Sequence, residues 1–169
     1  MFAQLLVLVA LPALLLVAAL CDLARYTIPN RLCAALAALF LVFAAAMAMP
    51  LPLLGWHLAA GTAGLVLGFA LFAFGWIGGG DAKLFAAIAL WLGFGDLLAY
   101  AAAASLFGGA LTLALLTLRQ VPLPAALLGQ GWILRLHDRQ SGIPYGVALA
   151  AGAFAVLPHA AIFRLAAQG

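Results

Sequence analysis

Two aspartates could carry chemistry in this chain, because each interrupts a strongly apolar sequence. Asp22 follows a long apolar run, in the stretch CDLARYTIPN, and Asp81 follows three glycines in GGGDAKL. An ionisable side chain in such surroundings is costly and therefore indicates a functional site. Two carboxylates that share a site hold one proton between them, because both cannot ionise cheaply. Such a pair can activate a water and hydrogen-bond a carbonyl oxygen, which is the chemistry of aspartyl proteolysis.

The residues around Asp81 suggest how a peptide would reach it. Gly78, Gly79 and Gly80 leave the backbone bare, so an extended peptide can approach and pair with it. Lys83 follows two residues after Asp81, where its long side chain can reach the membrane interface and also bias the charge of the carboxylate. We therefore predict that the three glycines and Lys83 shape the site.

The composition excludes a water-soluble globule. Of the 169 residues, 69% are hydrophobic and 7% are charged, whereas a soluble domain is about 45–50% apolar and about 25% charged. A membrane-spanning helix needs about 20 mostly apolar residues, and the chain offers several such runs. We predict an all-α, polytopic integral membrane protein that forms a single domain over residues 1–169.

Breaks rich in glycine and proline divide the apolar sequence into six predicted transmembrane helices. We place them at about residues 3–22, 31–49, 56–76, 82–94, 97–118 and 143–163. An even number of spans puts both termini on one side of the membrane. Asp22 then closes the first helix and Asp81 opens the fourth, at the same face.

The basic residues set the orientation, because short cytoplasmic loops are enriched in lysine and arginine. Only Arg164 falls on the side of the termini. The other side holds Arg25, Arg31, Lys83, Arg119, Arg135 and Arg139. We predict that this second side is the cytoplasm, that the N-terminus lies outside, and that both aspartates face the cytoplasm. The net charge of +3 then reflects topology and implies no nucleic-acid partner.

The remaining polar residues have structural explanations. We expect residues 119–142 to lie on the cytoplasmic leaflet as an interfacial segment, with docking of a partner as the alternative. Asp96 stands in GFGD, falls on the outer side and is expected to cap the helix at 97–118. Cys21 and Cys33 lack the spacing of a zinc site and are expected to pack. The three histidines are scattered on different sides, so we predict no metal and no cofactor: they are His57, His137 and His159.

Three segments resemble known membrane proteases. GGGDAKL is similar to the GxGD signature of membrane-embedded aspartyl proteases, and CDLARYTIPN resembles the segment that carries the other aspartate in type IV prepilin peptidases. GIPYGVALA, residues 142–150, looks like the last helix of the small prepilin peptidases that serve Flp (Tad) pili. The segments occur in the right order and cover nearly the whole chain.

This resemblance implies an endopeptidase of the bacterial inner membrane with Asp22 and Asp81 as its catalytic pair. Its substrate would be a prepilin, whose basic leader is cut on the cytoplasmic side of its hydrophobic helix. Pro144, Tyr145 and Gly146 would then bind substrate or shape the site. The lipid bilayer and the pilus assembly machinery are the other implied partners. The chain lacks the paired cysteines of larger, methylating relatives, so we predict no methyltransferase activity.

Two functions of other classes remain open. Asp22 and Asp81 could bind a proton or cation beside interrupted helices in a small transporter component, or the chain could be a non-catalytic scaffold of a pilus or secretion machine. The sequence shows no inverted repeat, which a transporter often has. Size analysis of a co-expressed pilin-like precursor separates these functions from proteolysis.

Overall fold

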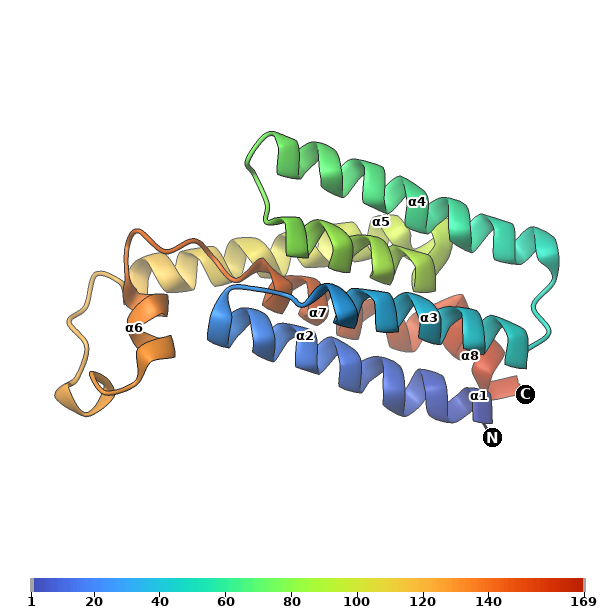
Figure 1. Ribbon diagram of the computed structural model, residues 1–169, viewed down its shortest axis with the longest axis horizontal. Helices are drawn as coiled ribbons and strands as arrows, with labels where there is room; N and C mark the ends of the chain where they lie inside the picture. The colour runs from blue at the N-terminus through green and yellow to red at the C-terminus, as the bar shows by residue number, and fades with distance from the viewer. Residues whose placement is uncertain (1, 169) are drawn as a thin grey trace.

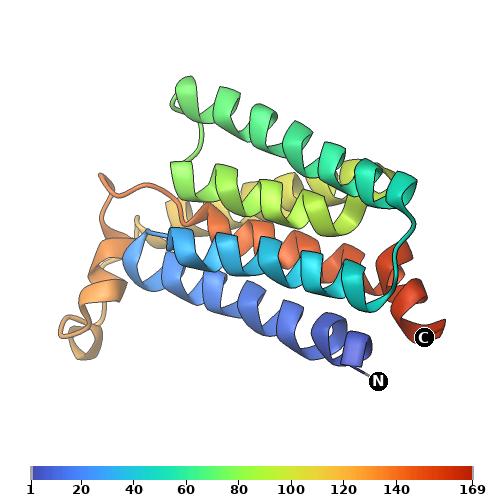
Figure 2. The same ribbon diagram turned by 45° about the vertical axis from the view of Figure 1, so that its right-hand side comes forward.

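The chain folds into a bundle of antiparallel helices, drawn in Figures 1 and 2. The computed structural model describes residues 2–168, and this part of the chain contains helices and no strand. Its elements are α1 (Phe2–Leu5), the π-helical turn η1 (Leu6–Ala10), α2 (Leu11–Arg25), α3 (Asn30–Ala46), α4 (Leu51–Ala73), α5 (Gly79–Leu118), η2 (Ala125–Leu127), α6 (Gly131–His137), α7 (Tyr145–Val156), η3 (Leu157–His159) and α8 (Ala161–Gln168). The predicted all-α class is confirmed.

The helices have the length and surface of a membrane protein. Three segments are long and apolar enough to cross a membrane, namely Phe2–Arg25, Leu51–Ala73 and Gly79–Leu118. The apolar segments Asn30–Ala46 and Tyr145–His159 are shorter. Large hydrophobic side chains on the outer faces of these helices are exposed. Lipid chains can cover such an apolar surface, and helices satisfy their backbone hydrogen bonds internally, as a membrane requires.

The longest element, α5, consists of two antiparallel halves that meet at Gly93. This residue has φ 66° and ψ 179°, a combination that is essentially restricted to glycine. In Figure 1 the first half of α5 runs along the bundle and the second half returns beside it. The predicted break between residues 94 and 97 therefore lies at Gly93, and the chain reverses there without a separate loop.

Glycines on α4 hold the first half of α5 in place. A Cβ added at Gly64 would lie 2.9 Å from the Cβ of Ala89, and one added at Gly68 would lie 3.0 Å from the Cα of Ala82. A Cβ added at Gly61 would lie 3.0 Å from the Cβ of Leu90. Small residues let membrane helices approach closely. This contact fixes the position of the first half of α5 along α4, including the turn that carries Asp81.

Aromatic side chains join α3 to α5 in the centre of the bundle. Trp91 is fully buried and its indole N–H donates a hydrogen bond of 2.9 Å to the carbonyl oxygen of Leu36. Phe40 packs edge-on against Trp91, with ring centroids 5.5 Å apart. Nδ1 of His57 lies 2.9 Å from the carbonyl oxygen of Leu90. The ring nitrogens of Trp91 and His57 are thus hydrogen-bonded to backbone carbonyl groups, as expected in a low-dielectric interior.

Two predicted helices differ from the structure, in both cases because of proline. The third was expected at 56–76, but α4 begins at Leu51 because Pro52 lies in its first turn, where a missing N–H breaks no helical hydrogen bond. The last was expected as one helix over 143–163. Instead α7 ends at Val156, the turn η3 contains Pro158, and α8 follows. Residues 119–142 include η2 and α6.

The expected role of Asp96 was wrong. Asp96 lies in the first turn of the second half of α5, but its side chain binds another helix. Its Oδ2 accepts a hydrogen bond of 3.1 Å from the backbone N–H of Ala161, the first residue of α8. A carboxylate at a helix N-terminus satisfies a free N–H group there. Asp96 therefore caps α8, which the sequence did not separate from the preceding helix.

Candidate active site

Asp22 lies in the last turn of α2 and is held by the first turn of α7. Its side chain is buried, and Oδ2 accepts a hydrogen bond of 2.7 Å from the backbone N–H of Gly146. Helix α2 ends three residues later, where Tyr26 adopts a left-handed conformation and its N–H binds the carbonyl oxygen of Asp22. The carboxylate is thus fixed by segments from distant parts of the chain.

Asp81 lies in the first turn of α5 and uses only one of its oxygens locally. Oδ2 accepts a hydrogen bond of 3.1 Å from the backbone N–H of Gly78, the N-cap residue. Oδ1 is buried and has no hydrogen-bond partner among residues 2–168. A buried polar atom without a partner is rare in folded proteins and calls for an explanation. At an active site, such an atom is available for substrate or water.

The fold brings the two carboxylates to the same end of the bundle. Asp22 lies at the end of α2 and Asp81 at the start of α5, and Figure 1 shows these two helix ends at the same end of the bundle. Ile28 lies in the turn between α2 and α3. It packs against Gly80, which precedes Asp81, and against Gly146, which binds Asp22. A Cβ added at Gly80 would lie 3.2 Å from the Cβ of Ile28, and one added at Gly146 would lie 2.8 Å from its Cδ1. The three helices α2, α5 and α7 thus converge on Ile28.

The glycines of the site are close-packed. Gly79 faces the ring of Phe72, and a Cβ added at Gly79 would lie 3.4 Å from the nearest ring carbon. A Cβ at Gly146 would also lie 2.9 Å from both Cβ and Oδ2 of Asp22, a separation that real Cβ atoms do not tolerate. Pro144 is buried and precedes α7 as its N-cap residue. Pro144 and Gly146 therefore set how the first turn of α7 meets Asp22.

A cavity of about 330 Å³ opens beside Asp81. Its walls come from α4, both halves of α5 and the start of α7, and Asp81 and Tyr145 are among the lining residues. The ring of Tyr145 packs against Gly108, and a Cβ added at Gly108 would lie 3.3 Å from the nearest ring carbon. Apart from Asp81, Ser105 and Tyr145, the cavity is lined by apolar residues and glycines. The carboxylate thus faces a space whose walls are mostly apolar.

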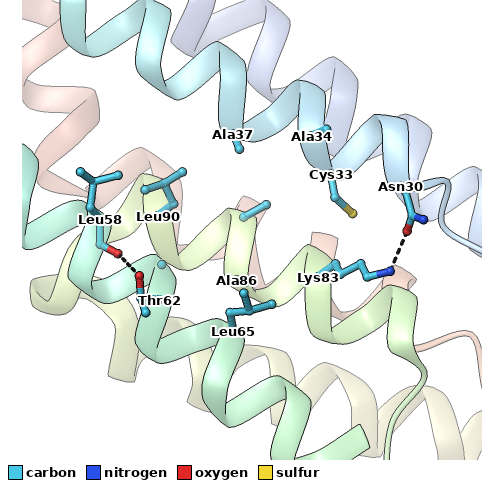
Figure 3. Close-up of a pocket in the computed structure, with 12 residues that line it drawn as sticks. Asn30, Cys33, Ala34, Ala37, Leu58, Thr62, Leu65, Lys83, Ala86 and Leu90 are labelled. Carbon is cyan, nitrogen blue, oxygen red and sulfur yellow. Dashed lines mark hydrogen bonds between the residues drawn. The ribbon is translucent and has the colours of Figure 1, made fainter.

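Lys83 lies away from this cavity. Its side chain is exposed, and Nζ donates a hydrogen bond of 2.8 Å to Oδ1 of Asn30. Figure 3 shows this contact at the edge of a second cavity of about 460 Å³, between α3, α4 and α5. Cys33 also lines that cavity. The structure therefore groups Lys83 with α3, and it places Asp22, Asp81, the three glycines and the Pro144–Gly146 turn together.

Arg119 fixes the 119–142 segment to the end of α5, a role that was not predicted from the sequence. Arg119 is buried at the end of α5, where Nε donates to the carbonyl oxygen of Leu136 and Nη2 to that of Gly142, at 2.7 and 2.8 Å. These bonds tie the 119–142 segment down just before Pro144. Arg135 of α6 donates to the carbonyl oxygen of Ala24 in α2. Both arginines were interpreted only as indicators of membrane orientation. A buried guanidinium that binds carbonyl groups has no sequence signature.

A metal centre does not emerge from the described part of the chain. Among residues 2–168, no three or more histidine, cysteine, aspartate or glutamate side chains are placed to hold a metal ion. His57 lies in the aromatic core, His137 ends α6 and His159 ends η3. Two buried carboxylates, one of them with a free oxygen beside a cavity, can instead act as a general acid–base pair.

Comparison with known proteins identifies the family. A model of the type IV leader peptidase family matches residues 9–113, more than half of the chain. The matched range contains both aspartates and ends before α7, which supplies the hydrogen bond to Asp22. No curated protein and no solved structure matches the chain. The chain therefore belongs to the type IV leader peptidase family, whose activity is of the aspartic peptidase type.

Proposed function

We propose that this protein removes the leader peptide of Flp/Tad-type prepilins at the cytoplasmic face of the bacterial inner membrane. Asp22 and Asp81 are its catalytic pair. The observation that carries this assignment is that two buried carboxylates, from α2 and α5, lie at the same end of the bundle. Oδ1 of one of them, Asp81, has no hydrogen-bond partner among residues 2–168, and Asp81 lines a cavity. The proposal includes no metal, no cofactor and no methyl transfer.

The hydrogen bonds of the pair suggest how hydrolysis proceeds. Gly146 holds Oδ2 of Asp22 and Gly78 holds Oδ2 of Asp81, so each carboxyl group presents its other oxygen in a fixed direction. The pair shares one proton. Its ionised member takes a proton from water, whose oxygen attacks the carbonyl carbon of the scissile bond, while the protonated member donates a hydrogen bond to the carbonyl oxygen. The carbon–nitrogen bond then breaks and the amine leaves with a proton.

The charge distribution supports a cytoplasmic active site. Arg25 at the end of α2, Arg119 at the end of α5 and Arg135 in α6 belong to the end of the bundle that carries the aspartates. Short loops rich in basic residues stay in the cytoplasm. In the proposed six-span arrangement, the two halves of α5 count as separate spans and the N-terminus lies outside.

Substitution of the two carboxylates tests the proposal. We expect Asp22→Asn and Asp81→Asn each to reduce leader cleavage at least about 100-fold, because the amide cannot take part in acid–base catalysis. Purified variants are mixed with a prepilin, and mass spectrometry follows the cleavage site and rate. Asp96→Asn is the control, since Asp96 caps α8 and should leave cleavage intact. Near-normal cleavage by either of the first two variants would refute the pair, and an uncut precursor with the wild-type protein would favour transport or a scaffold role.

A further inference from the structure

The cavity beside Asp81 continues along the bundle into a neighbouring one. A third cavity of about 320 Å³ shares three lining residues with it, namely Leu67, Phe85 and Ala101. The two cavities therefore lie end to end between α4 and the second half of α5, and we call them together the α4–α5 groove. Along its floor, the first half of α5 rises about 18 Å from Asp81 to Gly93.

The chemistry of this groove changes from one end to the other. Its polar residues, Asp81, Ser105 and Tyr145, line only the cavity at the Asp81 end. The third cavity, at the other end of the groove, is lined entirely by apolar residues and glycine, as far as Phe94 and Leu98. The polar end is marked by Oδ1 of Asp81, which is buried without a partner among residues 2–168 in a residue only 8% exposed. A ligand that fits is polar at one end and apolar along its length.

One wall of the groove is built to receive a helix. Ala101, Ser105 and Gly109 follow each other at intervals of four residues, so they lie on one face of the second half of α5. Small residues at this spacing let the backbone of another helix come close in a membrane. A Cβ added at Gly109 would meet no atom within 4 Å, so the space in front of this wall is open.

We propose that the α4–α5 groove binds the hydrophobic helix of the prepilin and thereby places the bond that precedes this helix at Asp81. This inference rests on the proposed function and specifies where the substrate lies. The cavity of about 460 Å³ between α3, α4 and α5 does not meet these requirements. It has no aspartate in its lining, and its lysine already donates to Asn30.

Photo-crosslinking from two neighbouring leucines of α4 tests the position of the substrate. Leu67 lines the α4–α5 groove and is 51% exposed, whereas Leu65 lines the cavity in Figure 3 and is 46% exposed. A photoreactive phenylalanine analogue is placed at one or the other position of the Asp22→Asn protein, which keeps the prepilin uncut. We expect crosslinks to the prepilin helix from position 67 and at least tenfold fewer from position 65. Crosslinks mainly from position 65, or only to lipid from position 67, would overturn the proposal.

Filling the groove gives an independent kinetic test. In Gly109→Leu the added Cβ meets no atom within 4 Å and the new side chain occupies groove space, so we expect KM for the prepilin to rise at least tenfold with little change in kcat. Gly95→Leu is the matched control, because Gly95 lies in the same half of α5, has equally open space and lines neither cavity. Equal KM values for the two variants would overturn the groove assignment.

The two proposals fail in different ways. If the wild-type protein cleaves the prepilin and Asp22→Asn does not, the proposed function holds whatever the groove variants show. In that case a normal KM for Gly109→Leu, together with absent crosslinks from position 67, refutes the groove alone. If the wild-type protein does not cleave the prepilin, the proposed function fails first.

Discussion

Gly146 positions Asp22 through both its backbone and its lack of a side chain. Its N–H donates to Oδ2 of the aspartate, and a Cβ at this position would lie 2.9 Å from the same oxygen. We expect Gly146→Ala to displace the carboxylate and to reduce leader cleavage about 100-fold, the effect of moving a reacting group by about 1 Å. Cleavage of a prepilin by the purified variant measures this loss.

Gly142 provides the comparison for this substitution. It lies four residues before Gly146, and an added Cβ would meet no atom within 4 Å. Gly142→Ala should therefore cleave as the wild-type protein does, and both variants should remain folded in detergent. Full activity of Gly146→Ala would show that Asp22 does not depend on the first turn of α7.

Some residues of the site could be predicted from the sequence and others could not. Asp22 and Asp81 were visible because charged residues are scarce in an apolar chain. Gly146 was singled out only through its resemblance to a known motif. Ile28, which contacts both Gly80 and Gly146, carries no signal of its own, because 69% of the residues are hydrophobic. Packing partners of this kind depend on the three-dimensional fold.

At the scale of elements, Gly93 allows α5 to fold back on itself. Its φ of 66° and ψ of 179° cost other residues about 1–3 kcal/mol, and an added Cβ would lie 3.2 Å from the ring of His57. We expect Gly93→Ala to lower the free energy of unfolding by at least this amount. Thermal denaturation in detergent measures the change. Gly95→Ala should behave in the opposite way and stabilise by about 0.5–1 kcal/mol, because Gly95 is helical and unobstructed.

The sequence predicted where helices break better than how they pack. Pro29, Pro50 and the glycines 78–80 were recognised directly as breaks, and the break predicted between residues 94 and 97 lies close to Gly93. The split between α7 and α8 was missed although Pro158 marks it, because the apolar sequence continues past it. Which faces meet was not predictable, since these helices are apolar on nearly all sides. The contact of Gly64 and Gly68 with α5 became evident only in the structure.

At the scale of the whole molecule, the proposed orientation follows from charge. The antiparallel helices place the end with Asp22 and Asp81 opposite the end with the N-terminal α1 and with α8. We expect tags at the N-terminus and after Asp96 to be accessible from outside the cell, and a tag near residue 130 only from the cytoplasm. Labelling of intact and opened cells with a membrane-impermeant reagent measures this. A tag near residue 130 that reacts in intact cells would reverse the proposed orientation.

The hydrogen bond between Gly146 and Asp22 spans 124 positions of the sequence, which has a consequence for biosynthesis. Ribosomes add residues from the N-terminus onward, so both aspartates enter the membrane well before the turn that positions one of them. The nascent protein is therefore expected to be inactive until α7 is inserted. Chains that stop before Pro144 should be recovered from the membrane but should leave a co-expressed prepilin at its full size.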